Sequence, residues 1–276
     1  ALVYVNDLEG KITKINLTNL SGNFAFNAAT GIVSQGSGQS VALYDNYTFF
    51  DLQASSSNNR YMYHAMDAGI GQNGNFWLYG STGNYMNLSD TGIFDPDNNV
   101  KNVMFGIKDF YYPFFGSTTS STAGNTIDTL ANCKDMTGDT TSCDAATKRG
   151  WYINLDGASK VTAEPTLARG VAYYPIFKPV RNNTECGSGV AYICGIEAEC
   201  GKNLSSELDP TNAGSYGNRD CYKVGTGVLS KVVVFNNNLY ANISDKSNYA
   251  TKTDIVVIEA IQRSIIDFRN SWRENF

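Results

Sequence analysis

Residues 3–17, VYVNDLEGKITKINL, contain two short β-prone runs separated by a polar turn that ends in Gly10. In the second run, Thr13, Ile15 and Leu17 alternate with Lys14 and Asn16. This is the period of two that a half-buried strand shows, with one face toward a core and one toward solvent. The stretch therefore predicts a β-hairpin, and we expect Thr13, Ile15 and Leu17 on its buried face.

Runs of the same kind recur along the chain, mostly four to eight residues long and separated by turn residues. Residues 251–268 also show a helical spacing of Ile, but their Ile and Val density and the lack of a cap favour strands. The further strands are expected at residues 41–44, 47–52, 61–65, 76–79, 103–107, 150–155, 171–177, 190–196, 228–235, 239–243, 255–260 and 264–269.

This strand content predicts an all-β fold of the sandwich, barrel or propeller type. A hydrophobic strand that ends in a Gly turn recurs loosely at residues 3–10, 76–83 and 192–195, which favours the blades of a β-propeller. Two polar stretches, about 116–147 and 179–223, interrupt the rhythm and are expected to be long surface loops.

Composition limits the classes of function. The chain has 276 residues, is 42% hydrophobic and only 17% charged, and so can bury the core of one large β-domain. A net charge of −5 without a block of Lys or Arg argues against nucleic-acid binding. No apolar run reaches the ~18 residues of a membrane span. The single histidine, His64, excludes a multi-histidine metal site within the chain and makes a histidine-dependent nucleophile improbable.

The cysteines indicate an exported, disulfide-bonded protein. Their number is even and their neighbours are polar, whereas no C-x-x-C motif supports the alternatives of a zinc site or free thiols. Proximity favours a Cys133–Cys143 bridge, and a Cys200–Cys221 bridge between two expected strands would leave Cys186 to pair with Cys194; this is one of 15 possible pairings. The six residues are Cys133, Cys143, Cys186, Cys194, Cys200 and Cys221.

Several segments, taken in order, resemble the C-terminal propeller domain of the PilC/PilY family of type IV pilus tip-associated adhesins. The resemblance begins with the blade-opening residues 3–17, although Thr13 stands where the family has Trp and Asn16 where it has Asp. It continues through residues 77–83, 104–109, 150–155 and 170–174, and it ends with Ser271-Trp272-Arg273-Glu274.

This resemblance implies a non-enzymatic β-propeller with irregular blades and disulfide-bonded loops, at the tip of a type IV pilus outside the cell. It implies roles in adhesion and in pilus extension and retraction, with minor pilins and a host-cell, surface or matrix ligand as partners. The 276 residues would then be one propeller domain or the later blades of a larger one. Relatives carry a calcium loop upstream of the opening strand, so calcium is expected only in the intact protein and no cofactor in this chain.

Individual residues suggest one candidate ion site and one candidate catalytic base, and neither is the favoured interpretation. Asp95, Asp97 and Asn99 have the D-x-D-x-N opening of a calcium loop, but the closing acidic ligand is absent, so a plain turn is favoured over a weak metal site. His64 beside Asp67 could act as an oriented base, although a packed structural histidine is the more common case.

Two other classes of function stay open. An exported propeller hydrolase acting on glycans needs only two suitably spaced carboxylates, and Asp67, Asp109, Asp156 and Glu164 are available. A structural subunit of a surface filament would use the exposed strand edges of an incomplete propeller. The Tyr- and Asn-rich loops are also suited to binding glycans or protein.

Overall fold

The hairpin at residues 3–17 forms in the computed structural model. Strand β1 (Leu2–Asn6) pairs antiparallel with β2 (Lys11–Asn16), and Gly10 closes the turn at a φ of 79°, which a residue with a Cβ rarely adopts. The structure describes residues 1–17, 24–27, 32–35, 43–55, 58, 60–71, 74–86, 88, 102–113, 115, 127–138, 148–180, 189–208, 213–216, 219–244 and 255–262.

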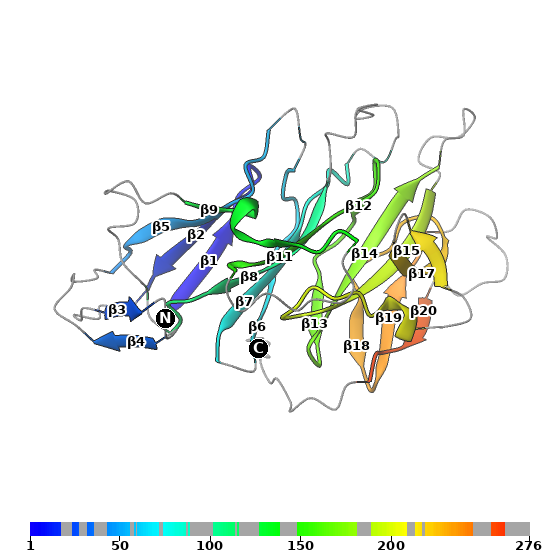
Figure 1. The fold of residues 1–276 in the computed structure, drawn as a ribbon. Coiled ribbons are helices and arrows are strands. Elements are labelled where there is room, and N and C mark those ends of the chain that lie inside the picture. Colours follow the sequence, from blue (N-terminus) through cyan, green and yellow to red (C-terminus); the bar gives the residue numbers. More distant parts are fainter. Residues whose placement is uncertain are drawn as a thin grey trace.

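The hairpin opens the first of four mainly antiparallel sheets (Figure 1). They follow one another along the sequence, except that the last strand of the first sheet comes after three strands of the second. The first sheet has the order β1-β2-β5-β9, with β5 at Asn46–Asp51 and β9 at Asp128–Thr129. The second sheet has the order β10-β11-β8-β7-β6; these strands are β6 (Asp67–Ile70), β7 (Phe76–Ser81), β8 (Val103–Asp109), β10 (Lys134–Asp135) and β11 (Gly150–Asn154).

The third sheet is the largest and the fourth the smallest of these four. The third has the order β12-β14-β15-β17-β16, with β13 also on β14; its strands are β12 (Lys160–Val161), β13 (Thr166–Ala168), β14 (Val171–Pro179), β15 (Gly189–Glu197), β16 (Ala213–Tyr216) and β17 (Arg219–Thr226). The fourth has the order β18-β19-β20; its strands are β18 (Val233–Phe235), β19 (Asn238–Asn242) and β20 (Ile255–Glu259).

Small elements complete the described part. A separate hairpin joins β3 (Phe24–Asn27) and β4 (Ile32–Gln35), and two 3₁₀ turns lie at Leu130–Asn132 and Ser205–Glu207. The described residues contain no helix of the length and apolar character that would cross a membrane.

Three apolar cores hold the four sheets together, because alternate side chains of one strand enter different cores. Trp77 and Tyr79 of β7 pack between the second and third sheets, whereas Leu78 packs between the first and second. In the same way, Tyr174 of β14 faces the second sheet and Tyr173 faces the fourth. Several antiparallel sheets that pack in succession, each on its neighbour, are arranged as the blades of a β-propeller are, in agreement with the predicted all-β propeller fold.

The blades form an open row in the described part of the chain. The first and fourth sheets lie at opposite ends of this row in Figure 1, and each of the three cores joins neighbouring sheets only.

Close contacts fix how the second and third sheets meet. Trp151 of β11 lies opposite Gly106 of β8, where an added Cβ would come within 2.7 Å of the indole ring. The Trp151 Nε1–H donates to the Ala198 carbonyl oxygen at 2.7 Å, and the Tyr174 hydroxyl donates to the Phe105 carbonyl oxygen at 2.9 Å. Each large aromatic group therefore buries its ring and satisfies its polar atom across the interface.

Some expected secondary structure differs from what forms. The stretch at 179–223 contains β16 and β17 as well as β15, because its polar residues pair as a hairpin. Residues 61–65 are not a strand: Met62 bonds instead to the Leu8 carbonyl, and Tyr63 packs on Tyr85. In the expected strand at 41–44 the described residues form a turn, and residues 264–269 lie outside the described part.

The disulfide links two strands within the third sheet. Cys194 of β15 is bonded to Cys221 of β17, so the predicted bridges Cys200–Cys221 and Cys186–Cys194 are wrong. Cys200 is also disulfide-bonded, and Cys133 is a free, buried thiol, which excludes the predicted bridge to Cys143. Closeness in sequence was misleading because sheet pairing brings together cysteines 27 residues apart.

We predict that Cys194→Ala/Cys221→Ala lowers the free energy of unfolding by about 3.5 kcal/mol, the loop-entropy value for a 27-residue separation. Both sulfur atoms lie in the apolar core, so alanine leaves no buried polar group. Urea unfolding measures the difference. Cys133→Ala is the control because it removes a buried thiol without opening a cross-link; an equal loss in both variants would contradict the prediction.

Candidate functional site

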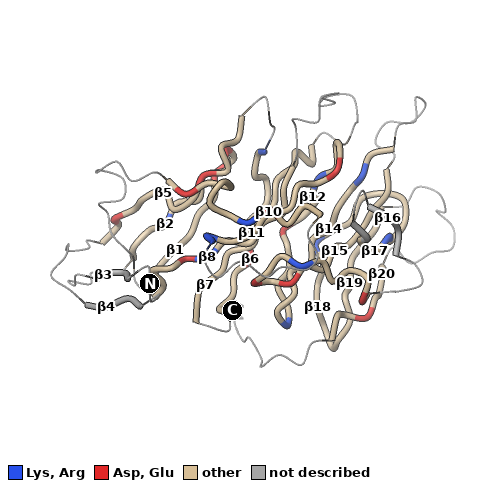
Figure 2. Tube along the Cα trace, in the orientation of Figure 1, with Lys and Arg blue, Asp and Glu red and all other residues tan. Residues whose placement is uncertain are grey.

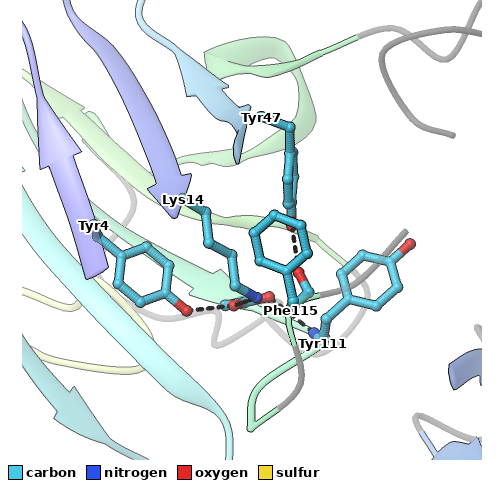
Figure 3. Close-up of polar contacts among 6 residues, drawn as sticks. Tyr4, Lys14, Tyr47, Tyr111 and Phe115 are labelled. Atoms are coloured by element: carbon cyan, nitrogen blue, oxygen red, sulfur yellow. Dashed lines mark hydrogen bonds and ion pairs between the residues drawn. The ribbon is translucent and has the colours of Figure 1, made fainter. Parts of the chain in front are cut away.

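The most unusual group of residues is a buried ion pair between the first and second sheets. Lys14 of β2 and Asp109 of β8 both have side chains with 0% exposure, and Lys14 Nζ lies 2.5 Å from Asp109 Oδ2 (Figure 3). Moving each charge out of water costs several kcal/mol. Such a pair is therefore stable only where further hydrogen-bond partners offset this desolvation penalty.

Surrounding groups donate hydrogen bonds to both oxygens of the Asp109 carboxylate. The Tyr4 hydroxyl donates to Oδ2 at 2.5 Å, and the Tyr111 backbone N–H donates to Oδ1 at 2.9 Å. The rings of Tyr4 and Phe115 lie 5.7 and 5.9 Å from the Lys14 ammonium, within cation–π range. We call Tyr4, Lys14, Asp109, Tyr111 and Phe115 the buried polar centre (Figure 3).

The position of Lys14 corrects the predicted orientation of β2. Ile12, Lys14 and Asn16 are the buried positions of this strand, whereas Thr13 and Ile15 are only partly buried. The alternation was predicted correctly but assigned to the wrong face, because a lysine ordinarily points toward solvent. A carboxylate that comes from residue 109 makes the opposite orientation stable.

Burial controls the protonation of this centre. Desolvation lowers the pKa of Lys14, although the Asp109 carboxylate opposes the shift. Desolvation and the nearby Asp109 charge raise the pKa of Tyr4 far above its ordinary value, so its hydroxyl keeps its proton and remains a donor. A closed group with fixed protons is suited to joining two sheets rather than to turning over a substrate.

A second group of cations lies beside the centre: Lys108 is on β8, and Arg149 directly precedes β11. Lys108 Nζ is 4.9 Å from the Phe110 ring centroid and 5.7 Å from that of Trp77. The Arg149 guanidinium lies 4.5 Å from the Phe110 ring and forms an ion pair with Asp128. Burial, followed by the Arg149 charge, lowers the pKa of Lys108 to about 8.

The carboxylates considered for a hydrolase each contact a different partner. Asp67 accepts the backbone N–H of Leu167 at 2.7 Å, and Asp109 belongs to the buried polar centre. Asp156 pairs with Lys178 at 2.8 Å and Glu164 with Lys231 at 2.6 Å. Each carboxylate is held by a partner of its own, so the hydrolase hypothesis gains no support from the geometry.

His64 is not oriented by Asp67. The two Asp67 oxygens accept backbone N–H groups, those of Ala68 and Leu167. The His64 ring instead lies 4.8 Å from the Tyr85 ring, and its Nε2 is buried without a hydrogen-bond partner. Burial lowers its pKa, as expected for a packed, neutral imidazole.

The predicted ion site cannot be placed, because Asp95, Asp97 and Asn99 lie outside the described residues. Among the residues that the structure describes, no three His, Cys, Asp or Glu side chains come together as a group that could hold a metal. Lys and Arg are spread over several sheets in this part of the chain (Figure 2).

Comparison with known proteins finds a likeness in shape to solved structures. No protein-family model and no curated protein matches the sequence. Among solved structures, the chain is similar to the crystal structure of the Pseudomonas aeruginosa PilY1 C-terminal domain, with a TM-score of 0.49 and 12% identity. The match covers 94% of this chain and 56% of that one, so this chain spans a little over half of its length. A likeness of this degree carries no conclusion about function.

We predict that Lys14→Met lowers the free energy of unfolding by about 3–5 kcal/mol, because it leaves Asp109 charged and buried without its cation. The double variant Lys14→Met/Asp109→Leu removes both charges and should lose much less, as urea unfolding would show. Lys11→Met is the matched control, since Lys11 lies on the same strand in an exposed pair with Glu9. A double variant as unstable as Lys14→Met would contradict this account.

We also predict a pH-dependent stability from Lys108. Its pKa is about 8 in the folded chain against an ordinary 10.5, so the folded state binds fewer protons and gains stability as the pH rises between these values. Lys108→Met has no group that titrates at this position. Between pH 8 and 10.5, the free energy of unfolding of the wild type should therefore rise relative to that of Lys108→Met. Lys108→Arg stays charged and should show no such change relative to Lys108→Met. Parallel wild-type and Lys108→Met curves would count against the shift.

Proposed function

We propose that this chain is the propeller portion of a non-enzymatic adhesin or biogenesis factor associated with the tip of a type IV pilus. The proposal is carried by the ordered segments that resemble the PilC/PilY family, because they coincide with the strands that build successive blades. Residues 3–17 form the β1–β2 hairpin, residues 77–83 contain β7 from its second residue to its end, and residues 104–109 lie in β8. Residues 150–155 contain β11, and residues 170–174 open β14.

The matched segments also supply the largest buried side chains. Trp77, Phe105, Trp151 and Tyr174 are each at most 2% exposed. These residues are used in packing, so the scaffold is rigid and recognition falls to the loops that it holds.

One described loop surface has the composition expected for recognition. Tyr85 and Met86 are 40% and 74% exposed, and the Tyr85 ring packs on both Tyr63 and His64. Rigid aromatic side chains with a polar end provide contact area at low entropic cost. We call Tyr63, His64, Tyr85 and Met86 the aromatic surface cluster, and we propose that it contacts a host-cell, surface or matrix ligand while minor pilins hold the domain at the pilus tip.

The test compares cells that lack the gene with cells that express variants. Deletion should reduce surface pili, twitching and adhesion, and the wild-type gene should restore all three. Tyr85→Ser/Met86→Ser should restore pili and twitching but not adhesion, because it changes the aromatic surface cluster and no buried residue. Val180→Ser, at another exposed apolar position, is the control and should restore everything. Normal piliation, twitching and adhesion after deletion would rule out the proposal.

A further inference from the structure

The two sheets at the ends of the row each carry apolar side chains on a second face, and the fourth sheet shows this most clearly. It packs on the third sheet through Leu239, Ala241 and Ile258. Its other face carries four large apolar side chains that are more than half exposed and belong to none of the three cores; these are Val233 (54%), Phe235 (70%), Ile255 (55%) and Val257 (55%).

The strand register shows that these side chains form one surface. Val233 and Val257 lie directly opposite Tyr240 from its two sides, so the three make one row across the sheet. Phe235 lies two residues after Val233, and Ile255 two residues before Val257, so both extend this row on the same face. We call Val233, Phe235, Tyr240, Ile255 and Val257 the fourth outer face.

The first sheet has a corresponding surface on the side away from the second sheet. Val5, Thr13 and Thr48 lie opposite one another across β1, β2 and β5, and Val3 lies opposite Ile15 on the same face. Val5 is 47% exposed and the other four side chains are partly buried, and none of the five belongs to a core of the chain. We call Val3, Val5, Thr13, Ile15 and Thr48 the first outer face.

The sequences of the end strands indicate that both outer faces are covered. Strand β1 reads LVYVN and β20 reads IVVIE, so each is apolar at four consecutive positions. Runs of this kind are typical of strands with both faces buried, such as β8 and β14. Within the chain only one face of each end sheet contributes to a core, so each outer face requires an occupant.

The area of the faces favours an occupant that uses both at once. Three strands about 4.8 Å apart, with about five residues of 3.3 Å each, give roughly 250 Å² for one face. A stable interface between separate proteins buries about 800 Å² on each partner. One face falls well short of this area, whereas the two faces together come much closer, because their exposed side chains add to the flat area.

A second copy of this chain meets this requirement. A two-fold axis can place the first outer face of each copy on the fourth outer face of the other, so that one association covers all four faces. The two surfaces also differ in relief. The fourth outer face carries the rings of Phe235 and Tyr240, whereas the first outer face consists of β-branched side chains and is flatter.

The number of sheets fits the same assembly. The described residues form four sheets that pack in a row, with the first and the fourth at its opposite ends (Figure 1). Two copies therefore supply eight blades, which is within the range of four to eight that closed propellers have.

We propose that two copies of this chain associate through their first and fourth outer faces and close into one ring of blades. The association buries the apolar surfaces that the open row leaves exposed. It is independent of any role at a pilus.

Light scattering of the purified 276-residue chain tests the assembly, and we expect a dimer. Val5→Lys changes the first outer face and Val257→Lys the fourth. Each should raise the dissociation constant at least about a hundredfold, because the dimer would bury two unpaired lysine side chains. Val180→Lys is the matched control, since Val180 is 41% exposed, follows β14 and lies outside both faces; this variant should stay dimeric.

Cross-linking tests which faces meet. A bismaleimide should link Val5→Cys chains to Val257→Cys chains in a mixture of the two, because one cysteine lies on each of the two touching faces. Either variant alone should give no more linked dimer than the wild type, whose native cysteines set the background.

Three outcomes would overturn the proposal. A monomer at every concentration would show that the faces do not associate. Oligomers that grow with concentration would show an open head-to-tail chain. A dimer that Val257→Lys dissociates and Val5→Lys leaves intact would show that two fourth sheets pack on each other. Because Val5 and Val257 are exposed, both variants are expected to fold, and circular dichroism checks this.

Discussion

Each central sheet has to bury both of its faces, and the rest of the structure depends on this constraint. The second and third sheets lie between neighbours, so their strands supply apolar side chains to two cores at once. Strands β8 and β14 are therefore nearly continuous apolar runs, whereas a sheet with one face in water would alternate. Sheets built in this way must stack, and stacking in chain order produces the row of blades.

The buried polar centre has a place in this arrangement. An ion pair is a costly way to join two sheets, because the desolvation of both groups must be offset by their partners. Lys14 and Asp109 meet this condition through the Tyr4 hydroxyl and the Tyr111 backbone N–H. Apolar contacts tolerate small displacements, whereas these hydrogen bonds require one position, so the pair fixes how the first sheet sits on the second. Such a scaffold agrees with a binding role for the loops.

Much of the fold could be predicted from local pattern. Strands β5, β7, β8, β11, β14, β15, β19 and β20 form close to the expected ranges, because hydrophobic period and turn residues act over a few positions. The candidate site could not be found in this way. Lys14 and Asp109 are 95 residues apart, and neither is unusual among its sequence neighbours. Asp67 and His64 were singled out for their closeness in sequence, but the fold directs them to different partners, Leu167 and Tyr85.

By itself, the sequence determined that the chain is all-β with short strands and that its apolar content is high enough to form a packed core. It also determined that only one histidine is available. These properties follow from composition and short-range periodicity. Only the tertiary structure decided which face of β2 is buried, and that Cys194 pairs with Cys221 while Cys133 stays free. The physical reason is that burial, pairing and charge neutralisation depend on partners from distant positions, which strand register and the packing of the sheets bring together.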